Sequence, residues 1–253
     1  MWLIAAFFAT ALLYASVGFG GGSTYTALLA LWGVDFRILP AISLLCNIIV
    51  VTGGTIRFHR AGLLEWNRAL PLALIAAPFA WLGGLTPIKE TMFLSLLAVS
   101  LLIAGVTLLV QREPGSNGAG PIAPPKRTDA KTLTVAVLLG YLAGLVGIGG
   151  GIFLAPFLHF TRWGSAKSIA AAASLFILVN SVAGLIGQSL KLGASGQFPA
   201  LADHWPLVLA VLMGGQIGGM MGIRLFSPLL LRRLTGALVL YVAGQLLWKL
   251  YGA

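Results

Sequence analysis

Uncharged, apolar stretches recur along the whole chain and constrain its fold more than any other feature. They cover residues 2–34, 38–56, 69–88, 91–111, 132–161, 168–190, 205–223 and 234–248. A helix needs about 20 apolar residues to cross the roughly 30 Å hydrocarbon core of a bilayer. Backbone polar groups have no water to bond to in lipid, so each run is predicted to be helical, and the lack of alternating polarity excludes a β-barrel. We predict an all-α polytopic membrane protein.

The charged residues and the single cysteine exclude several other classes. Only 9% of the 253 residues are charged, too few for a water-facing surface. The net charge of +10 comes from 16 basic residues scattered among short loops, which argues against a nucleic-acid partner. Cys46 lies inside an apolar run, with no spacing typical of a disulfide framework, a zinc site or a haem. We therefore expect no metal and no cofactor.

The chain contains two copies of one unit. The sequence GFGGG at residues 18–22 returns as GIGGG at residues 147–151, an offset of 129. Further matches pair Ser43 with Ser174, Gly53 with Gly184, Gly83 with Gly218 and Ala104 with Ala243. Because the offset grows only at loops, these matches indicate a duplication.

A polar segment separates the two copies. Residues 112–131 combine proline, glycine and charged residues, which is typical of a solvated linker. The predicted organisation is a first transmembrane repeat over 1–111, a cytoplasmic linker over 112–131 and a second transmembrane repeat over 132–253.

The basic residues also predict how the copies are oriented. If every run crossed the bilayer once, Lys and Arg would divide nine to seven between the two sides, with no bias. If the first run of each copy is re-entrant, leaving three crossings per copy, the division becomes twelve to four. The poorer side then holds only Arg37, Lys89, Lys191 and Lys249. The positive-inside rule favours this second arrangement, which is an inverted repeat with a cytoplasmic linker and both termini outside.

The two glycine blocks are candidate anion sites. Each glycine costs a helix nearly 1 kcal/mol relative to alanine, so the helix should break at Gly20–22 and at Gly149–151. Glycine exposes backbone N–H groups, and a helix that begins just after it directs its positive dipole end to the same point. In an inverted repeat the two breaks would meet near the bilayer midplane. The alternative is that these glycines serve close helix packing.

These blocks carry a family resemblance. Residues 18–22, together with GLVGIGGGIFLAP at residues 144–156, resemble the TauE/SafE sulfite exporter family, also called the 4-toluene sulfonate uptake permease family. Pro156 fits the family pattern, whereas the first copy has Ala27 at that position, which leaves its detailed site geometry open. The resemblance implies transport of sulfite, sulfonates, sulfoacetate-like compounds or other organic anions across the bacterial inner membrane.

The candidate substrate-binding residues are glycines of the blocks and uncharged polar residues near them or in the next run. They are Gly20, Gly21, Gly22, Ser23, Thr24, Ser43, Asn47, Gly149, Gly150, Gly151, Ser174 and Asn180. Uncharged donors coordinate an oxyanion without neutralising it permanently, which suits a carrier that must release its cargo. Ser43 and Asn47 are four residues apart and share a helix face. The alternative for each is an interhelical hydrogen bond worth up to about 2 kcal/mol.

Three further residues are candidates for a gate or for anion attraction. Arg57 lies at the end of the second run, and Gln188 is its neutral counterpart in the other copy. An interfacial arginine that sets topology is the alternative for Arg57. His159 follows Pro156 by three residues and is a candidate proton shuttle.

The predicted function is secondary transport of a small anion by alternating access, with a passive anion channel as the alternative. All six acidic residues fall in loops or at the ends of runs, namely Asp35, Glu65, Glu90, Glu113, Asp129 and Asp203. Without a buried carboxylate relay, coupling to a proton carried by the anion and coupling to the membrane potential both stay open. The spans lack the paired carboxylates, catalytic triad or metal ligands of an enzyme. The expected partners are the anion and the lipid bilayer, and a homodimer is compatible with the sequence.

Overall fold

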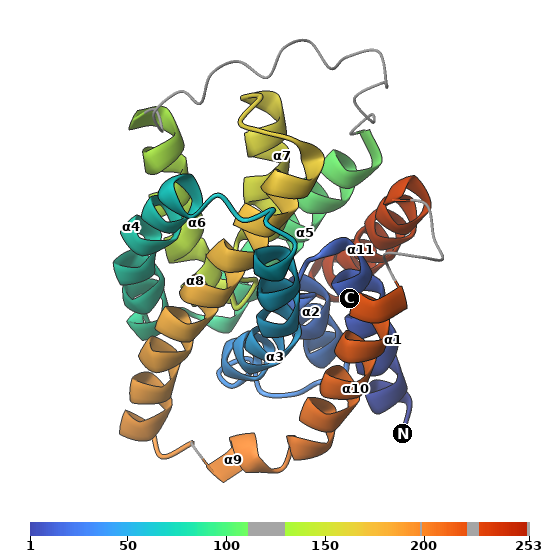
Figure 1. Cartoon of the computed structure of the whole chain (residues 1–253). Coiled ribbons are helices and arrows are strands. Elements are labelled where there is room, and N and C mark those ends of the chain that lie inside the picture. Colours follow the sequence, from blue (N-terminus) through green and yellow to red (C-terminus); the bar gives the residue numbers. More distant parts are fainter. Residues whose placement is uncertain (111–129, 198, 222–227, 252–253) are drawn as a thin grey trace.

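The computed structural model describes residues 1–110, 130–197, 199–221 and 228–251. The helices are α1 (Trp2–Val17), α2 (Gly22–Leu31), α3 (Leu39–Arg60), α4 (Trp66–Leu85), α5 (Glu90–Val110), α6 (Ala130–Val146), α7 (Gly151–Phe160), α8 (Ala166–Ala194), α9 (Pro199–Ala202), α10 (Trp205–Met221) and α11 (Pro228–Tyr251) (Figure 1). These described ranges contain no strand, and the all-α prediction is confirmed. The predicted linker falls outside them except for Ala130 and Lys131.

Four of the described helices, α3, α4, α5 and α8, are long and apolar enough to cross a membrane. The outer helices α4 and α5 expose large apolar side chains such as Leu74, Phe79, Val99 and Ile103. Keeping such surfaces in water would cost about 25 cal/mol per Å² of apolar area, so these faces are suited to lipid.

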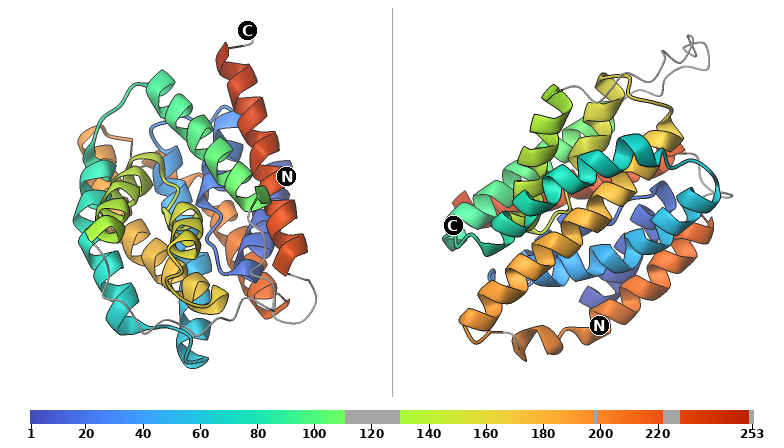
Figure 2. Two further views of the ribbon diagram at one scale, coloured as in Figure 1. Left: turned by 90° about the horizontal axis from the view of Figure 1, so that it is seen from above. Right: turned by 60° about the vertical axis from the view of Figure 1, so that its left-hand side comes forward.

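Helices α3 and α8 pack against each other at the centre of the molecule (Figure 2). Gly54 lies beside Ser174, while Gly184 lies beside Leu44, so the two helices run in opposite directions. Small residues at these contacts let the two backbones approach closely. The same register puts Asn47 of α3 opposite Ser181 of α8.

Both glycine blocks interrupt a helix, as the sequence predicts. Helix α1 ends at Val17 and α2 begins at Gly22, while α6 ends at Val146 and α7 begins at Gly151. The third glycine of each triplet is therefore the first residue of the following helix rather than part of the break. Gly21 and Gly150 cap the new helices with φ of 85° and 75°, a left-handed conformation that glycine adopts without steric cost.

The remaining long helices surround this centre. Helix α4 packs on α6 and α8, α10 packs on α1 and α3, and α5 packs on α11. Glycines allow two of these contacts, because a Cβ on Gly83 would overlap the carbonyl oxygen of Tyr141, and one on Gly218 would overlap that of Leu12. Helices from residues 1–111 thus pack directly on helices from residues 132–253.

The loops gather at two ends of the molecule. At the first, which we call the linker end, loops 61–65 and 161–165 meet: Arg68 pairs with Glu65 at 2.8 Å, donates to the carbonyl of Trp163 and stacks on its ring. At the opposite end, loops 32–38 and 86–89 lie close to the end of α8, where Gln197 contacts Asp35.

Candidate functional site

Asn47 lies at the point where the two glycine blocks meet. Its side chain is fully buried on α3, and neither amide atom has a hydrogen-bond partner among the described residues. A buried polar group without a partner costs about 1–3 kcal/mol. A buried polar group that lacks a protein partner requires an explanation, and a bound ligand or ion is one.

Glycine backbone surrounds the Asn47 amide on two sides. A Cβ on Gly20 or on Gly22 would overlap this amide, and one on Gly149 would lie 2.7 Å from Asn47 Nδ2. Only glycine leaves room for the side chain at these three positions. The structure thus brings Gly20, Gly22 and Gly149 together around one asparagine.

Hydroxyl groups join the two breaks next to Asn47. Ser43 Oγ lies 2.7 Å from the Gly22 carbonyl oxygen and 2.9 Å from that of Gly147, and its one proton is within reach of both acceptors. Thr26 Oγ1 donates to the Gly22 carbonyl at 2.9 Å and approaches that of Val146 at 3.4 Å. Ser43 was a predicted site residue and acts here as a bridge between the two halves. Thr26 was not predicted, although it follows Gly22 by one helical turn.

Both short helices begin at this point without a side-chain cap. Gly21 precedes α2 and Gly150 precedes α7, and in the described part of the chain neither helix has a side-chain cap bond. Each helix has ten residues, enough for its dipole to give the N-terminus a partial positive charge. Two helix starts therefore lie close to an unpartnered amide, an arrangement that favours an anion.

Ser181 is a site residue that the predicted set lacks. Its hydroxyl is buried without a partner among the described residues, and it would lie 3.3 Å from a Cβ on Gly149. Asn180, which was in the predicted set, instead donates to the Phe176 carbonyl of its own helix at 2.8 Å. One residue along a helix turns a side chain by about 100°, so this choice depends on the α3–α8 register rather than on the sequence pattern.

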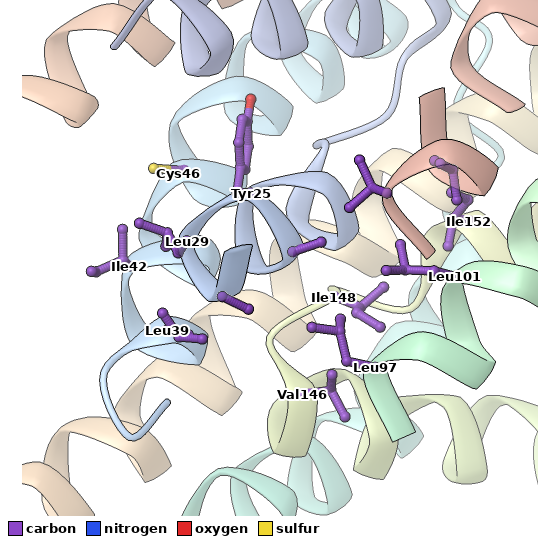
Figure 3. Close-up of a cluster of buried hydrophobic side chains, with 14 of the residues drawn as sticks. Tyr25, Leu29, Leu39, Ile42, Cys46, Leu97, Leu101, Val146, Ile148 and Ile152 are labelled. Atoms are coloured by element: carbon purple, nitrogen blue, oxygen red, sulfur yellow. The ribbon is translucent and has the colours of Figure 1, made fainter. Parts of the chain in front are cut away.

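A second group of hydroxyls lies on the α1 side of the first break. Tyr14 Oη and Thr24 Oγ1 are 2.8 Å apart, and Ser23 is buried beside them. Tyr25 stacks on Phe7 and extends its hydroxyl away from the apolar cluster around Leu29 (Figure 3). That hydroxyl is buried, has no partner among the described residues and would lie 3.1 Å from a Cβ on Gly21.

Three other predicted site residues make their contacts with groups other than Asn47. Ser174 Oγ bonds to Thr55 Oγ1 at 3.0 Å. Gly150 packs on Phe176, and Gly151 on Ile177. These three positions connect helices and form the walls behind the breaks.

The predicted gate residues occupy three different settings. Gln188 is fully buried and donates to the Gly144 carbonyl at 2.8 Å, so it fastens α6 to α8. Half-buried Arg57 lies flat on Gly219 of α10, where a Cβ would overlap its guanidinium. His159 is in the last turn of α7 at the linker end.

The polar groups around Asn47 are all neutral. Among the described residues, no group of three or more His, Cys, Asp or Glu side chains could hold a metal ion. Amide, hydroxyl and backbone N–H groups can bind an anion reversibly, since none of them forms a permanent ion pair.

The comparisons with known proteins point to one family. The sequence profile described as "Sulfite exporter TauE/SafE" matches residues 3–246. "Probable membrane transporter protein y4hK" of Sinorhizobium fredii is 33% identical over 97% of each chain. A "Probable membrane transporter protein" of Xylella fastidiosa is 29% identical, covering 91% of this chain and 88% of its own. "Probable membrane transporter protein MamO" of Magnetospirillum gryphiswaldense is 24% identical over 86% of this chain but only 39% of its own. No solved structure matches the chain.

Proposed function

Starting from the premise that the chain belongs to the TauE/SafE sulfite exporter family of membrane transporters, we propose that it is a secondary transporter of small sulfur-containing or organic anions. Sulfite, sulfonates and sulfoacetate-like compounds are the proposed substrates, and the bacterial inner membrane is the proposed location. The observation that carries the proposal is Asn47, a fully buried amide without a partner between two helix starts. An oxyanion there would accept from Asn47 Nδ2, from Ser181 and from the backbone N–H groups of the breaks.

The proposed architecture is an inverted repeat with two re-entrant hairpins and six full crossings. Equivalent contacts support it: Gly83 approaches the carbonyl of Tyr141, and its counterpart Gly218 approaches that of Leu12, the counterpart of Tyr141. The equivalent helices α3 and α8 also run in opposite directions, as an inversion requires. Each half would then carry one broken hairpin to the shared site.

Alternating access is favoured over a passive channel by the packing on one side of the site. Gly147 lies against Pro40, where a Cβ would come within 2.6 Å of the Pro40 Cα atom. This close backbone contact leaves no room for a side chain at Gly147, and in the proposed transport cycle the helices rearrange here to let an anion pass. The glycines of the breaks and the helix contacts built on small residues make such a rearrangement feasible.

Flux measurements in proteoliposomes test the proposed function. The panel comprises sulfite, sulfate, thiosulfate, sulfoacetate and small carboxylates. A transporter gives saturable flux with counterflow exchange for at least one of them. Flux that is linear in concentration, accompanied by single-channel currents, would instead establish a channel, and absence of flux for every anion would refute both.

Cysteine labelling tests the proposed orientation. One variant carries Ser116→Cys in the linker, and another carries Ser195→Cys just after α8. The proposal expects a membrane-impermeant thiol reagent to reach the first from the cytoplasm and the second from outside. Labelling of both from the same side would contradict it.

A further inference from the structure

A cavity of about 200 Å³ opens at the opposite end of the molecule, away from the linker end. Its lining comes from loop 32–38, the start of α3, loop 86–89, the start of α5, the end of α6, the end of α8 and the residues just after it. Elements of both halves of the chain thus form one cavity. None of its residues belongs to the site around Asn47.

The charged residues of this cavity are cations. Arg37 and Lys191 line it, and no carboxylate does. Within the described part of the chain neither side chain forms an ion pair; Lys191 Nζ reaches only the Thr86 carbonyl at 3.5 Å. Asp35, the acidic residue beside them, accepts instead from the Arg37 backbone N–H at 3.0 Å and from Gln197 at 3.4 Å. Two cations that face one cavity without an ion pair favour an anion there.

A neighbouring cavity provides an internal comparison. It measures about 450 Å³ and shares Arg37 and Phe36 with the first, but Asp35 and Glu90 also line it. Two carboxylates and one guanidinium make that larger cavity unfavourable for an anion. The anion preference therefore belongs to the smaller cavity that contains Lys191.

The walls of the smaller cavity are largely apolar. Phe36, Phe93, Ile88 and Leu192 line it together with two prolines. A cationic rim over an aromatic and aliphatic wall is complementary to an anion with a short carbon chain. An inorganic oxyanion would leave this apolar surface uncovered.

The floor of the cavity lies one layer from the glycine breaks. Pro40 and Leu145 line the cavity, and Pro40 packs directly on Gly147. The Gly147 carbonyl in turn accepts from Ser43, which bridges to Gly22. The cavity lining is thus connected to the second glycine break through the Pro40–Gly147 contact.

We propose that this cavity is a second anion-binding site, in which Arg37 and Lys191 hold the acidic group of a short-chain organic anion and the apolar wall holds its carbon chain. That an anion occupies this cavity before it moves to the central site rests on the proposed function, whereas the ability of the cavity to bind an anion does not. The apolar wall also indicates the substrate class, because it favours organic sulfonates or carboxylates over sulfite or sulfate.

Protection of an introduced thiol tests the site directly. Ser195 lines the cavity and is exposed, so Ser195→Cys in a Cys46→Ala background places one accessible thiol there. The full chain in nanodiscs is treated with sulfonatoethyl methanethiosulfonate in the presence of ethanesulfonate or of sulfate. We expect ethanesulfonate to slow the modification and sulfate to protect at least about tenfold more weakly. Equal protection by the two anions, or none by either, would overturn the proposal.

Charge removal provides the second arm of the test. Lys191→Met should weaken protection by ethanesulfonate at least about tenfold, because a charge-assisted hydrogen bond is lost. Arg37→Gln, at an exposed loop position, covers the case in which Lys191→Met does not fold. Unchanged protection in the variants that fold would overturn the proposal.

The variant Asn47→Leu separates this site from the central one. It should lose flux and keep full protection at Ser195→Cys. If the wild-type protein carries no anion in proteoliposomes but ethanesulfonate still protects the thiol, the proposed function fails while the second site stands.

Discussion

The two glycine breaks have similar backbone conformations, but the side chains that follow them differ in chemistry. Both end one helix and begin the next at the third glycine of the triplet, with a left-handed glycine just before it. The first break continues into Ser23, Thr24, Tyr25 and Thr26, whereas the equivalent residues after the second are Ile152, Phe153, Leu154 and Ala155. The interruption of the helix is thus common to both breaks, while the side-chain hydroxyls follow only the first.

This difference assigns separate tasks to the two breaks. The first supplies hydroxyls and lies beside Asn47 of its own half. The second supplies backbone at Gly149, and its flanking Val146, Ile148 and Ile152 belong to the same apolar cluster as Leu97 and Leu101 of α5 (Figure 3). We therefore expect variants in the second break to act through backbone geometry and variants in the first to act through hydrogen bonding.

Among the residues of the two breaks, the largest effect is expected at Gly149. A Cβ in Gly149→Ala would press on Asn47 and Ile177, and the residue has φ of 80°. We expect flux in proteoliposomes to fall by at least about a hundredfold while membrane insertion persists. Gly33→Ala is the matched control, since Gly33 has φ of 78° but nothing within 4 Å of its Cβ position. It carries the same backbone strain without the contact, so similar losses in both variants would contradict the assignment.

A smaller effect is expected when hydroxyls of the first break are removed one at a time. Tyr25→Phe deletes a buried hydroxyl without a partner among the described residues, so stability should hold while the KM for flux rises several-fold. Tyr14→Phe breaks the bond to Thr24, so it should lower the free energy of unfolding by about 1 kcal/mol with little change in KM. Thermal melts and flux on the same preparations check both variants. The reverse pattern would show that Tyr25 is a structural residue.

A change in KM of a similar size to that of Tyr25→Phe is expected at Ser181. Ser181→Ala removes one neutral donor beside Gly149, and a hydrogen bond of this kind contributes about 1 kcal/mol, so KM should rise about fivefold. Ser174→Ala is the comparison, because its hydroxyl is engaged with Thr55. A larger rise in KM for Ser174→Ala than for Ser181→Ala would contradict this placement and show that the anion lies nearer Ser174 on α8.

The sequence predicted the helical class and the positions of both helix breaks. Those features depend on apolar run length and on the cost of glycine, which are local properties. Ser43 and Asn47 were also predicted, because four residues of separation fix a shared helix face.

Side-chain directions on α8 could not be predicted in the same way. Ser181 rather than Asn180 faces Gly149, and that depends on how α3 crosses α8. Gln188 was proposed for a gate, yet it is buried against Gly144 because α4 and α6 cover that face. Packing among helices far apart in the sequence determined both outcomes.

Asn47→Leu tests the central claim most directly, since it removes the unpartnered amide and keeps a side chain of similar size. The account predicts that flux of every transported anion is lost while the melting temperature stays the same or rises, because an unsatisfied polar group leaves the core. Asn67→Leu, the same exchange at an exposed position of α4, should leave flux unchanged. Wild-type flux in Asn47→Leu would contradict the account, as would a loss of flux that merely follows a fall in melting temperature.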